Sequence, residues 1–321
     1  MSGEVTREHV ILAYRMMLGR EPESEDVIQH GMTNWPDLAS LGKAFAGSQE
    51  FGQRHGVNIH GMTPLDAGPM EVETEADPKT LARMINQLGH YWSQIGESAP
   101  HWSVLTEERY LPENVGPNLM AFYSQGAWDA RLLEAALARI GRKPQEFMHC
   151  VEYGCGVGRV TLHLAGLFKR VTGLDISAPH LKLAGVAMRE AQCENVTLRR
   201  VTAANIMPVG ECNLWFSRIV LQHNPPPVIL HILGRAFASL KPRGVAVFQV
   251  PVWLEGYKFR NAEYLSRELG TEMEMHAVPQ RAVLELAYRH GMILRDVRED
   301  NFLVGAPGRA VSNTFAFERI F

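Results

Sequence analysis

Three glycines alternate with other residues directly after a short apolar run, in the segment VEYGCGVGRVT at positions 151–161. Gly154, Gly156 and Gly158 form this series, and Glu152 precedes the first of them. A glycine-rich turn between a strand and a helix lets a ligand approach the backbone and meet the N-terminal end of the helix. The segment therefore predicts a binding loop for a nucleotide-like ligand.

Two common phosphate-binding patterns do not fit this loop. The dinucleotide fingerprint GxGxxG needs its third glycine at position 159, where the sequence has Arg159. The phosphate-cradling pattern GxxxxGK[ST] is also missing from the segment. What remains is ExGxGxG, for which tight turns without any ligand are the alternative interpretation.

The ExGxGxG pattern resembles motif I of class I S-adenosylmethionine-dependent methyltransferases, and the resemblance extends from about residue 80 to the C-terminus. It implies that S-adenosylmethionine is the cofactor and that the Glu152 carboxylate, at the strand tip, faces the cofactor's ammonium group directly or through water. Asp175, in GLDIS, lies 21 residues after Gly154 (175 − 154). In this family an acid at that place accepts both ribose hydroxyls.

The same resemblance suggests further cofactor contacts. Ile176 would pack on the adenine. The segment TAANIMPV has no Asp to meet the adenine amino group, so Asn205 is the candidate acceptor and Ile206 would cover the ring. An asparagine in such a loop also often bonds its own backbone. Tyr123 is the candidate partner of the cofactor carboxylate.

Two histidines are candidate bases. His223, in SRIVLQHNPPPVIL, follows the fourth strand of the fold that the resemblance implies, at the carboxyl edge of the sheet. Transfer from a sulfonium mainly needs a positioned nucleophile and, for a neutral hydroxyl, a base. A histidine suits that role, although His223 could instead cap the turn before the prolines. His276 is the second candidate.

The segment 251–280 is longer than an ordinary strand–helix connection and is rich in aromatic residues. We expect a lid over the acceptor, in which Trp253 and Tyr257 stack on a sugar or ring face. A small satellite core is the alternative. Asn313 could reach the same cleft from the last strand.

From Phe147 onward, short apolar strands alternate with helices, which predicts an α/β fold. We expect a Rossmann-like, doubly wound and mostly parallel sheet, and the two strands after residue 290 suggest an antiparallel C-terminal edge strand.

The N-terminal part reads as a small all-α domain. Its first helix should end at Gly19, with further helices over Ser24–His30 and Leu38–Phe51. YRMMLGREPE and FAGSQEF resemble a small helical domain of bacterial exopolysaccharide and cell-envelope proteins. We therefore expect an interaction domain at 1–57 that binds a protein partner, a linker at 58–78 and the methyltransferase domain at 79–321.

Composition limits the other classes. The formal net charge is −3, which gives no basic surface for nucleic acid. No stretch has the apolar length of a membrane span, and the N-terminus lacks a signal-peptide pattern, so we expect a cytoplasmic protein. The 4 cysteines form no CxxC pair, which predicts free thiols and no metal site.

These patterns together predict an S-adenosylmethionine-dependent methyltransferase that O-methylates a sugar or glycan in cell-envelope or exopolysaccharide synthesis. A small-molecule or natural-product N-methyltransferase is one alternative, because an amine acceptor needs no general base. A non-catalytic binding protein that keeps the cofactor fold is the other.

Overall fold

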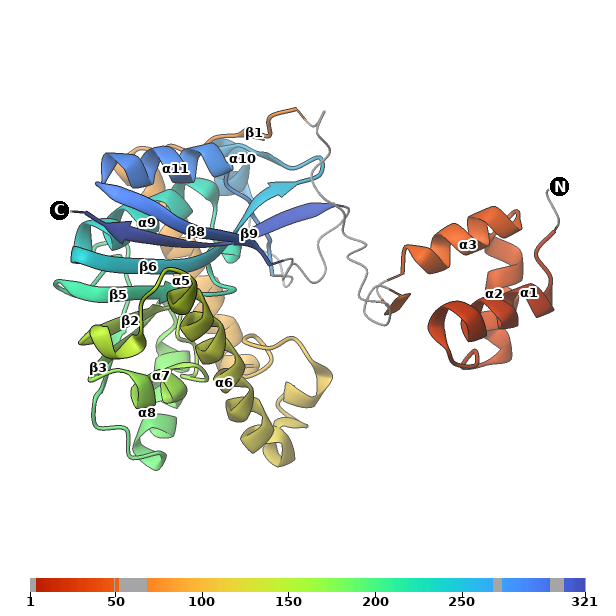
Figure 1. Ribbon diagram of the computed structural model, residues 1–321, viewed down its shortest axis with the longest axis horizontal. Coiled ribbons are helices and arrows are strands. Elements are labelled where there is room, and N and C mark those ends of the chain that lie inside the picture. Colours follow the sequence, from red (N-terminus) through yellow and green to blue (C-terminus); the bar gives the residue numbers. More distant parts are fainter. Residues whose placement is uncertain (1–3, 49, 52–67, 268–272, 301–308, 321) are drawn as a thin grey trace. The chain divides into compact units, whose positions relative to one another are not determined.

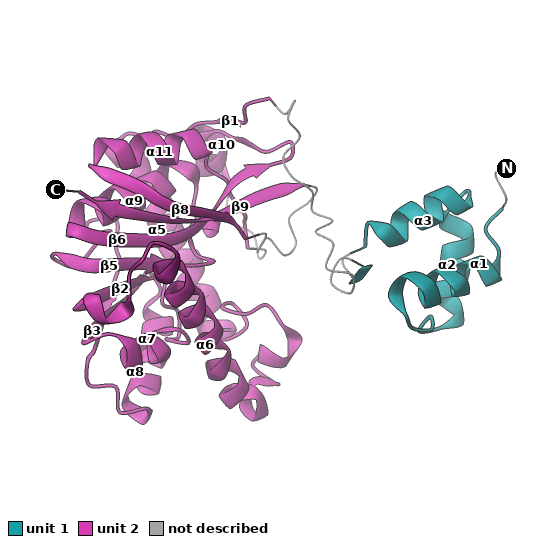
Figure 2. Ribbon diagram, in the orientation of Figure 1, with its two compact units in different colours: residues 1–62 teal, residues 63–321 magenta. Residues whose placement is uncertain are grey.

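The structure is a computed structural model that describes residues 4–48, 50–51, 68–267, 273–300 and 309–320. The chain divides into two compact units, residues 1–62 and 63–321 (Figure 2). The division falls inside the segment expected to be a linker, of which residues 58–67 lie outside the described part.

The first unit consists of short helices, of which the three α-helices have side-chain caps at their N-terminal ends. They are α1 (Arg7–Ala13), the π-helical η1 (Tyr14–Leu18), α2 (Glu25–Asn34) and α3 (Leu38–Ala46). Gly19 ends η1 with a left-handed φ of 59°, as the sequence predicts. The third helix ends at Ala46, before the predicted end at Phe51, because the Ser48 N–H bonds to the Phe45 carbonyl at 3.0 Å instead of continuing the helical ladder to Ala44. The small core of this unit consists of the buried side chains of Val5, Val10, Ile28 and Leu41.

The second unit is built on a seven-stranded sheet of order β4-β3-β2-β5-β6-β9-β8 (Figure 1). Strands β4, β3, β2, β5 and β6 are parallel, and β9 is antiparallel to both β6 and β8. The strands are β2 (His149–Tyr153), β3 (Arg170–Asp175), β4 (Val196–Arg200), β5 (Cys212–Ser217), β6 (Leu240–Leu254), β8 (Met292–Glu299) and β9 (Ala310–Arg319). The predicted fold class is confirmed, with one difference: the C-terminal strand β9 lies between β6 and β8, and β8 is the edge.

Helices cover both faces of this sheet. One face packs against α5 (Pro78–Ser98), α9 (Pro226–Ser239) and α11 (Gln280–Arg289), and the other against α6 (Val115–Arg139) and α7 (Thr161–Leu167). Along β5, for example, Trp215 lies in the first core, whereas Leu214 and Phe216 lie in the second. The central strands β2 and β5 are therefore buried on both sides, as their apolar runs predict, whereas the outer strands β4 and β8 are largely exposed. The helix α8 (Ala178–Glu190) follows β3.

Short elements complete the unit. They are β1 (Glu71–Val72), η2 (Glu108–Tyr110), η3 (Pro144–Glu146), η4 (Leu221–His223), β7 (Lys258–Phe259) and α10 (Asn261–Ser266). Strand β1 pairs in parallel with β7, so the end of the expected linker belongs to the folded unit. Glu71 explains the difference, because it pairs with Lys258 at 2.6 Å and with Arg260 at 3.5 Å.

No helix in the described residues is long and apolar enough to cross a membrane. The four cysteines are free thiols, and three of them are buried. Within the described residues, no group of three or more His, Cys, Asp or Glu side chains could hold a metal ion.

Candidate active site

The glycine loop connects β2 to α7, and all three of its glycines have left-handed backbone angles. The φ values are 78° for Gly154, 53° for Gly156 and 84° for Gly158. A Cβ atom on Gly154 would lie 2.4 Å from Val220, and one on Gly156 would lie 2.9 Å from Val104. Both conformation and space therefore require glycine here.

Asp175 ties this loop to the end of β3. Its Oδ2 accepts a hydrogen bond from the Gly156 N–H at 2.8 Å, and its Oδ1 accepts from the Ser177 N–H at 2.8 Å. Each carboxylate oxygen has a second lone pair, so both remain able to accept from a ligand hydroxyl. The geometry fits the role in ribose binding that the sequence suggests.

Glu152 is buried near the end of β2. Its side chain is 4% exposed and accepts a hydrogen bond from the Thr161 hydroxyl at 2.5 Å, on the face of the sheet covered by α7. Burial raises the pKa of this carboxyl to about 8, although the bond from Thr161 acts against the shift. In this buried environment Glu152 is therefore mostly protonated at neutral pH, and a positive charge close to it would favour the ionised form.

A buried ion-pair cluster that the sequence analysis missed connects the loop to the turn after β5. Asp129, on α6, is 3% exposed and pairs with Arg159 at 2.7 Å and with Arg218. Arg159 ends the glycine loop and Arg218 follows β5 directly. The sequence feature that could have revealed this cluster is Asp129 itself, an acidic residue on the apolar face of α6 beside Ala130 and Leu133.

The turn after β5 is held by a buried glutamine. Ile219 has a left-handed φ of 55°, which is strained for a β-branched residue. The Gln249 Oε1 accepts from the Ile219 N–H at 2.9 Å, while its Nε2 donates to the Gln222 Oε1 at 3.1 Å and to the Ser312 hydroxyl at 2.6 Å. Gln249 is 1% exposed, so this network fixes the turn from inside.

His223 ends that turn, in the helical turn η4. Its Nδ1 donates to the Glu274 carbonyl oxygen at 3.0 Å, which leaves the lone pair on Nε2, where the Gln222 amide lies at 3.3 Å. Burial lowers the pKa of His223 to about 4, so the imidazole is neutral at physiological pH. Trp92 lies edge-on to the ring, with a centroid distance of 5.6 Å.

His276 is the centre of a small aromatic cluster. Its Nε2 donates to the Glu274 carboxylate at 3.1 Å, and the Tyr257 hydroxyl lies 2.8 Å from its Nδ1. The rings of Tyr257, Phe259 and Tyr264 surround it at centroid distances between 5.6 and 6.1 Å. Both ring nitrogens of His276 have polar partners, as do those of His223. His276 is 3% exposed whereas His223 is only half-buried, so His276 is the less accessible of the two candidate bases.

The remaining cofactor candidates lie in three places: beside the glycine loop, in the larger core and in an exposed turn after β4. The Tyr123 hydroxyl donates to the Val157 carbonyl at 3.4 Å. Ile206 is only 5% exposed and, like the partly buried Ile176, packs in the larger core. Asn205 is exposed and exchanges backbone hydrogen bonds with Thr202 in a tight turn.

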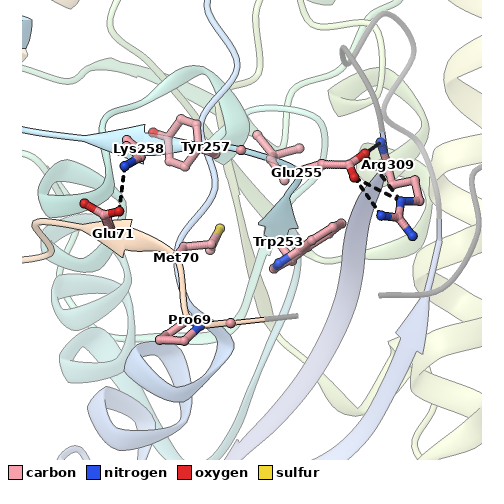
Figure 3. A pocket seen from close by; sticks show the side chains of 11 residues that line it. Pro69, Met70, Glu71, Trp253, Glu255, Tyr257, Lys258 and Arg309 are labelled. Carbon is pink, nitrogen blue, oxygen red and sulfur yellow. Dashed lines mark hydrogen bonds and ion pairs between the residues drawn. The ribbon is translucent and has the colours of Figure 1, made fainter. Parts of the chain in front are cut away.

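The substrate candidates separate into two places. Asn313 is 7% exposed and donates to the Gln280 Oε1 at 3.0 Å, so its amide already has a partner. Trp253 and Tyr257 line a cavity of about 580 Å³ beyond the carboxyl end of β6. Figure 3 shows Trp253 and Met70 between two ion pairs, Glu71–Lys258 and Glu255–Arg309, each at 2.6 Å. No residue of the glycine loop lines this cavity.

Residues 150–244 match the family described as "Methyltransferase domain". The chain contains a methyltransferase domain. It is the part that carries the glycine loop, Asp175 and His223, and S-adenosylmethionine is the cofactor of such domains. The predicted domain type and cofactor are therefore confirmed.

One curated relative and two solved structures illustrate the breadth of this likeness. The S-adenosyl-L-methionine-dependent Diels-Alderase iccD of Talaromyces variabilis is 33% identical over 87 residues, which are 25% of this chain and 29% of that protein. Magnesium protoporphyrin IX methyltransferase from Synechocystis PCC 6803, solved with bound SAH, is 16% identical with a TM-score of 0.50, over 73% of this chain and 99% of that one. A Galdieria sulphuraria protein described as a "putative sarcosine dimethylglycine methyltransferase" is 16% identical with a TM-score of 0.46, over 63% of this chain and 87% of that one. The likeness to the Synechocystis enzyme, with its TM-score of 0.50, shows the fold.

Proposed function

We propose that the protein transfers the methyl group of S-adenosylmethionine to a hydroxyl group of a sugar or glycan. The observation that carries this proposal is the state of His223. Its Nδ1–H is held by the Glu274 carbonyl, and burial, which lowers its pKa to about 4, keeps its Nε2 unprotonated at neutral pH. A neutral hydroxyl must lose its proton as the methyl arrives, and a positioned neutral imidazole can receive it.

The cofactor would lie across the carboxyl ends of β2 and β3. We assign the ribose hydroxyls to Asp175 and the methionine end to the loop of Gly154, Gly156 and Gly158, with Tyr123 beside the carboxylate. An ammonium group near Glu152 favours its charged form, so cofactor binding would shift this carboxyl from protonated to ionised. For the adenine, Ile176 and Asn205 remain the candidate contacts. Ile206 can contribute little contact area, because only 5% of its surface is exposed.

The acceptor would occupy the side of the sheet that carries β5 and β6. Val220 lies against Gly154, so the turn that bears His223 passes directly beside the cofactor loop. The cavity at Trp253 offers an indole face and two ion pairs, a combination that suits a sugar with many hydroxyls. Tyr257 lines that cavity and bonds to the His276 ring, and the backbone N–H of His276 bonds to the Gln222 carbonyl at 2.7 Å, so the cavity and the turn that bears His223 are connected through the protein.

A screen for methyl transfer tests this function. The full chain is incubated with methyl-labelled S-adenosylmethionine and cell extract fractions that separate glycans, lipid-linked glycans, small molecules and proteins. We expect label in a glycan fraction, in a bond that resists acid and base as an ether does. Label on an amine would establish the N-methyltransferase alternative, and no label in any fraction would favour a binding protein.

We further propose that residues 1–57 form an interaction domain for a protein of cell-envelope or exopolysaccharide synthesis in the cytoplasm. Leu12, Met16 and Leu38 expose 52%, 71% and 43% of their surface, which is much for apolar side chains in so small a unit. Removing residues 1–60 should leave the affinity for S-adenosylhomocysteine unchanged in calorimetry. A loss of affinity would show that the helical unit builds part of the cofactor site.

A further inference from the structure

Two tyrosine hydroxyls in the second unit are buried and have no hydrogen-bond partner in the part of the chain that the structure describes. They belong to Tyr91, on α5, and Tyr264, on α10. The Tyr264 side chain is only 1% exposed. A buried hydroxyl without a partner costs folding free energy that phenylalanine at the same position would not. Their presence suggests that a ligand supplies the missing bonds.

The Glu274 carboxylate acts on both tyrosines, and the contacts around it are defined best for Tyr264. The Arg267 guanidinium lies 5.6 Å from the centroid of the Tyr264 ring, and the His276 ring lies 5.9 Å from it. These two side chains are the partners of Glu274, at 2.9 Å and 3.1 Å. Burial raises the pKa of both phenols, and the negative charge of Glu274 raises it further. The Tyr264 ring therefore lies close to both side chains that bind the Glu274 carboxylate, Arg267 and His276.

The cluster is connected to His223. Tyr91 packs edge-on against Trp92 at a centroid distance of 5.5 Å, and Trp92 packs against His223. The backbone carbonyl of Glu274 accepts the bond from the His223 Nδ1. The unsatisfied hydroxyls thus belong to the same group of packed side chains as the candidate base.

We propose that Tyr91, Tyr264 and Glu274 form a subsite that binds hydroxyl groups of a neutral, polyhydroxylated acceptor beside His223. Tyrosine hydroxyls donate and accept, and a carboxylate accepts, so neighbouring hydroxyls of a sugar ring can satisfy all three. Arg267 already balances the charge of Glu274, so the subsite favours a neutral ligand over a cationic amine. This inference rests on the proposed function and names the groups that recognise the acceptor.

Thermal unfolding of two matched variants tests the hydroxyls without any acceptor. Tyr264→Phe removes an unpartnered hydroxyl, so we expect an unchanged melting temperature or a rise of up to about 4 °C. The control is Tyr110→Phe, because the equally buried Tyr110 hydroxyl accepts from the Gln125 amide at 2.5 Å. That variant should melt about 2 to 4 °C lower. A similar loss in Tyr264→Phe would overturn the proposal.

Binding of methyl β-D-glucopyranoside, as a neutral polyol probe, tests the ligand class. The full chain is saturated with S-adenosylhomocysteine, and binding is followed by ligand-detected NMR. We expect binding to the wild type, about 3- to 10-fold weaker in Tyr264→Phe and in Tyr91→Phe, and unchanged in Tyr110→Phe. No binding to the wild type, or equal affinity in all variants, would overturn the subsite. Neither readout needs methyl transfer, so a failure of the proposed reaction would be seen separately.

Discussion

The proposed cofactor edge and the proposed acceptor region of the second unit are built in different ways. The cofactor edge uses backbone groups and short loops: three glycines with positive φ, and Asp175 bonded to two backbone N–H groups. The acceptor region uses side chains from many elements, among them Gln249, His223, Tyr264 and Glu274. The first region constrains the local backbone, whereas the second depends on packing between distant segments.

The largest expected effect is at the cofactor edge. Asp175→Ala removes two charge-assisted bonds to the ribose, worth about 1.5 to 3 kcal/mol each, so affinity for S-adenosylhomocysteine should fall by about 10² to 10⁴. Calorimetry on the folded Asp175→Ala variant measures this affinity. The change should leave binding of a sugar probe intact, and an unchanged cofactor affinity would mean that the ribose lies elsewhere.

These two kinds of construction explain what the sequence could predict. The strand, glycine loop and Asp175 follow from spacing within 25 residues, since local backbone geometry sets them. Partners such as Asp129 for Arg159, or Gln249 for Ile219, come from segments 30 residues apart in sequence. The helical and strand periodicities of the sequence do not indicate contacts between such distant segments.

The protonation state of Glu152 could not be predicted from the sequence either, because the burial of its side chain depends on where α7 packs. Likewise, residues 71–72 read as a linker because their strand partner lies at 258–259.

A smaller effect is expected in the acceptor region. Gln249→Leu leaves the Ile219 N–H, the Gln222 Oε1 and the Ser312 hydroxyl without their buried partner, which should destabilise the unit by about 2 to 4 kcal/mol in denaturant unfolding. Turnover should also fall, because the turn that holds His223 is loosened, whereas cofactor affinity changes little. Gln145→Leu is the control, since Gln145 is exposed. A parallel loss of cofactor affinity would show that the two regions are not independent.

The smallest expected effect is the release of a proton from Glu152 when the cofactor binds. Burial raises the pKa of Glu152 to about 8, so the free protein holds a proton there at pH 7. The cofactor's ammonium favours the ionised form, so binding should release up to about one proton at pH 7 and progressively less as the pH rises above 8. Calorimetry in buffers of different ionisation enthalpy measures the release. Glu152→Gln should abolish it, and equal release in that variant would assign the proton to another group.

The most direct measurement is single-turnover methyl transfer to the labelled glycan acceptor by the wild type and by His223→Ala. The account predicts a rate about 10² lower in the variant, at the lower end for a positioned base because a pKa of about 4 makes His223 a weak one. The affinity for S-adenosylhomocysteine should stay equal. Protonation of His223 should also leave the wild-type rate unaffected between pH 6 and 9, because the imidazole is already neutral there. A variant rate equal to the wild type would contradict the assignment of His223 as the base.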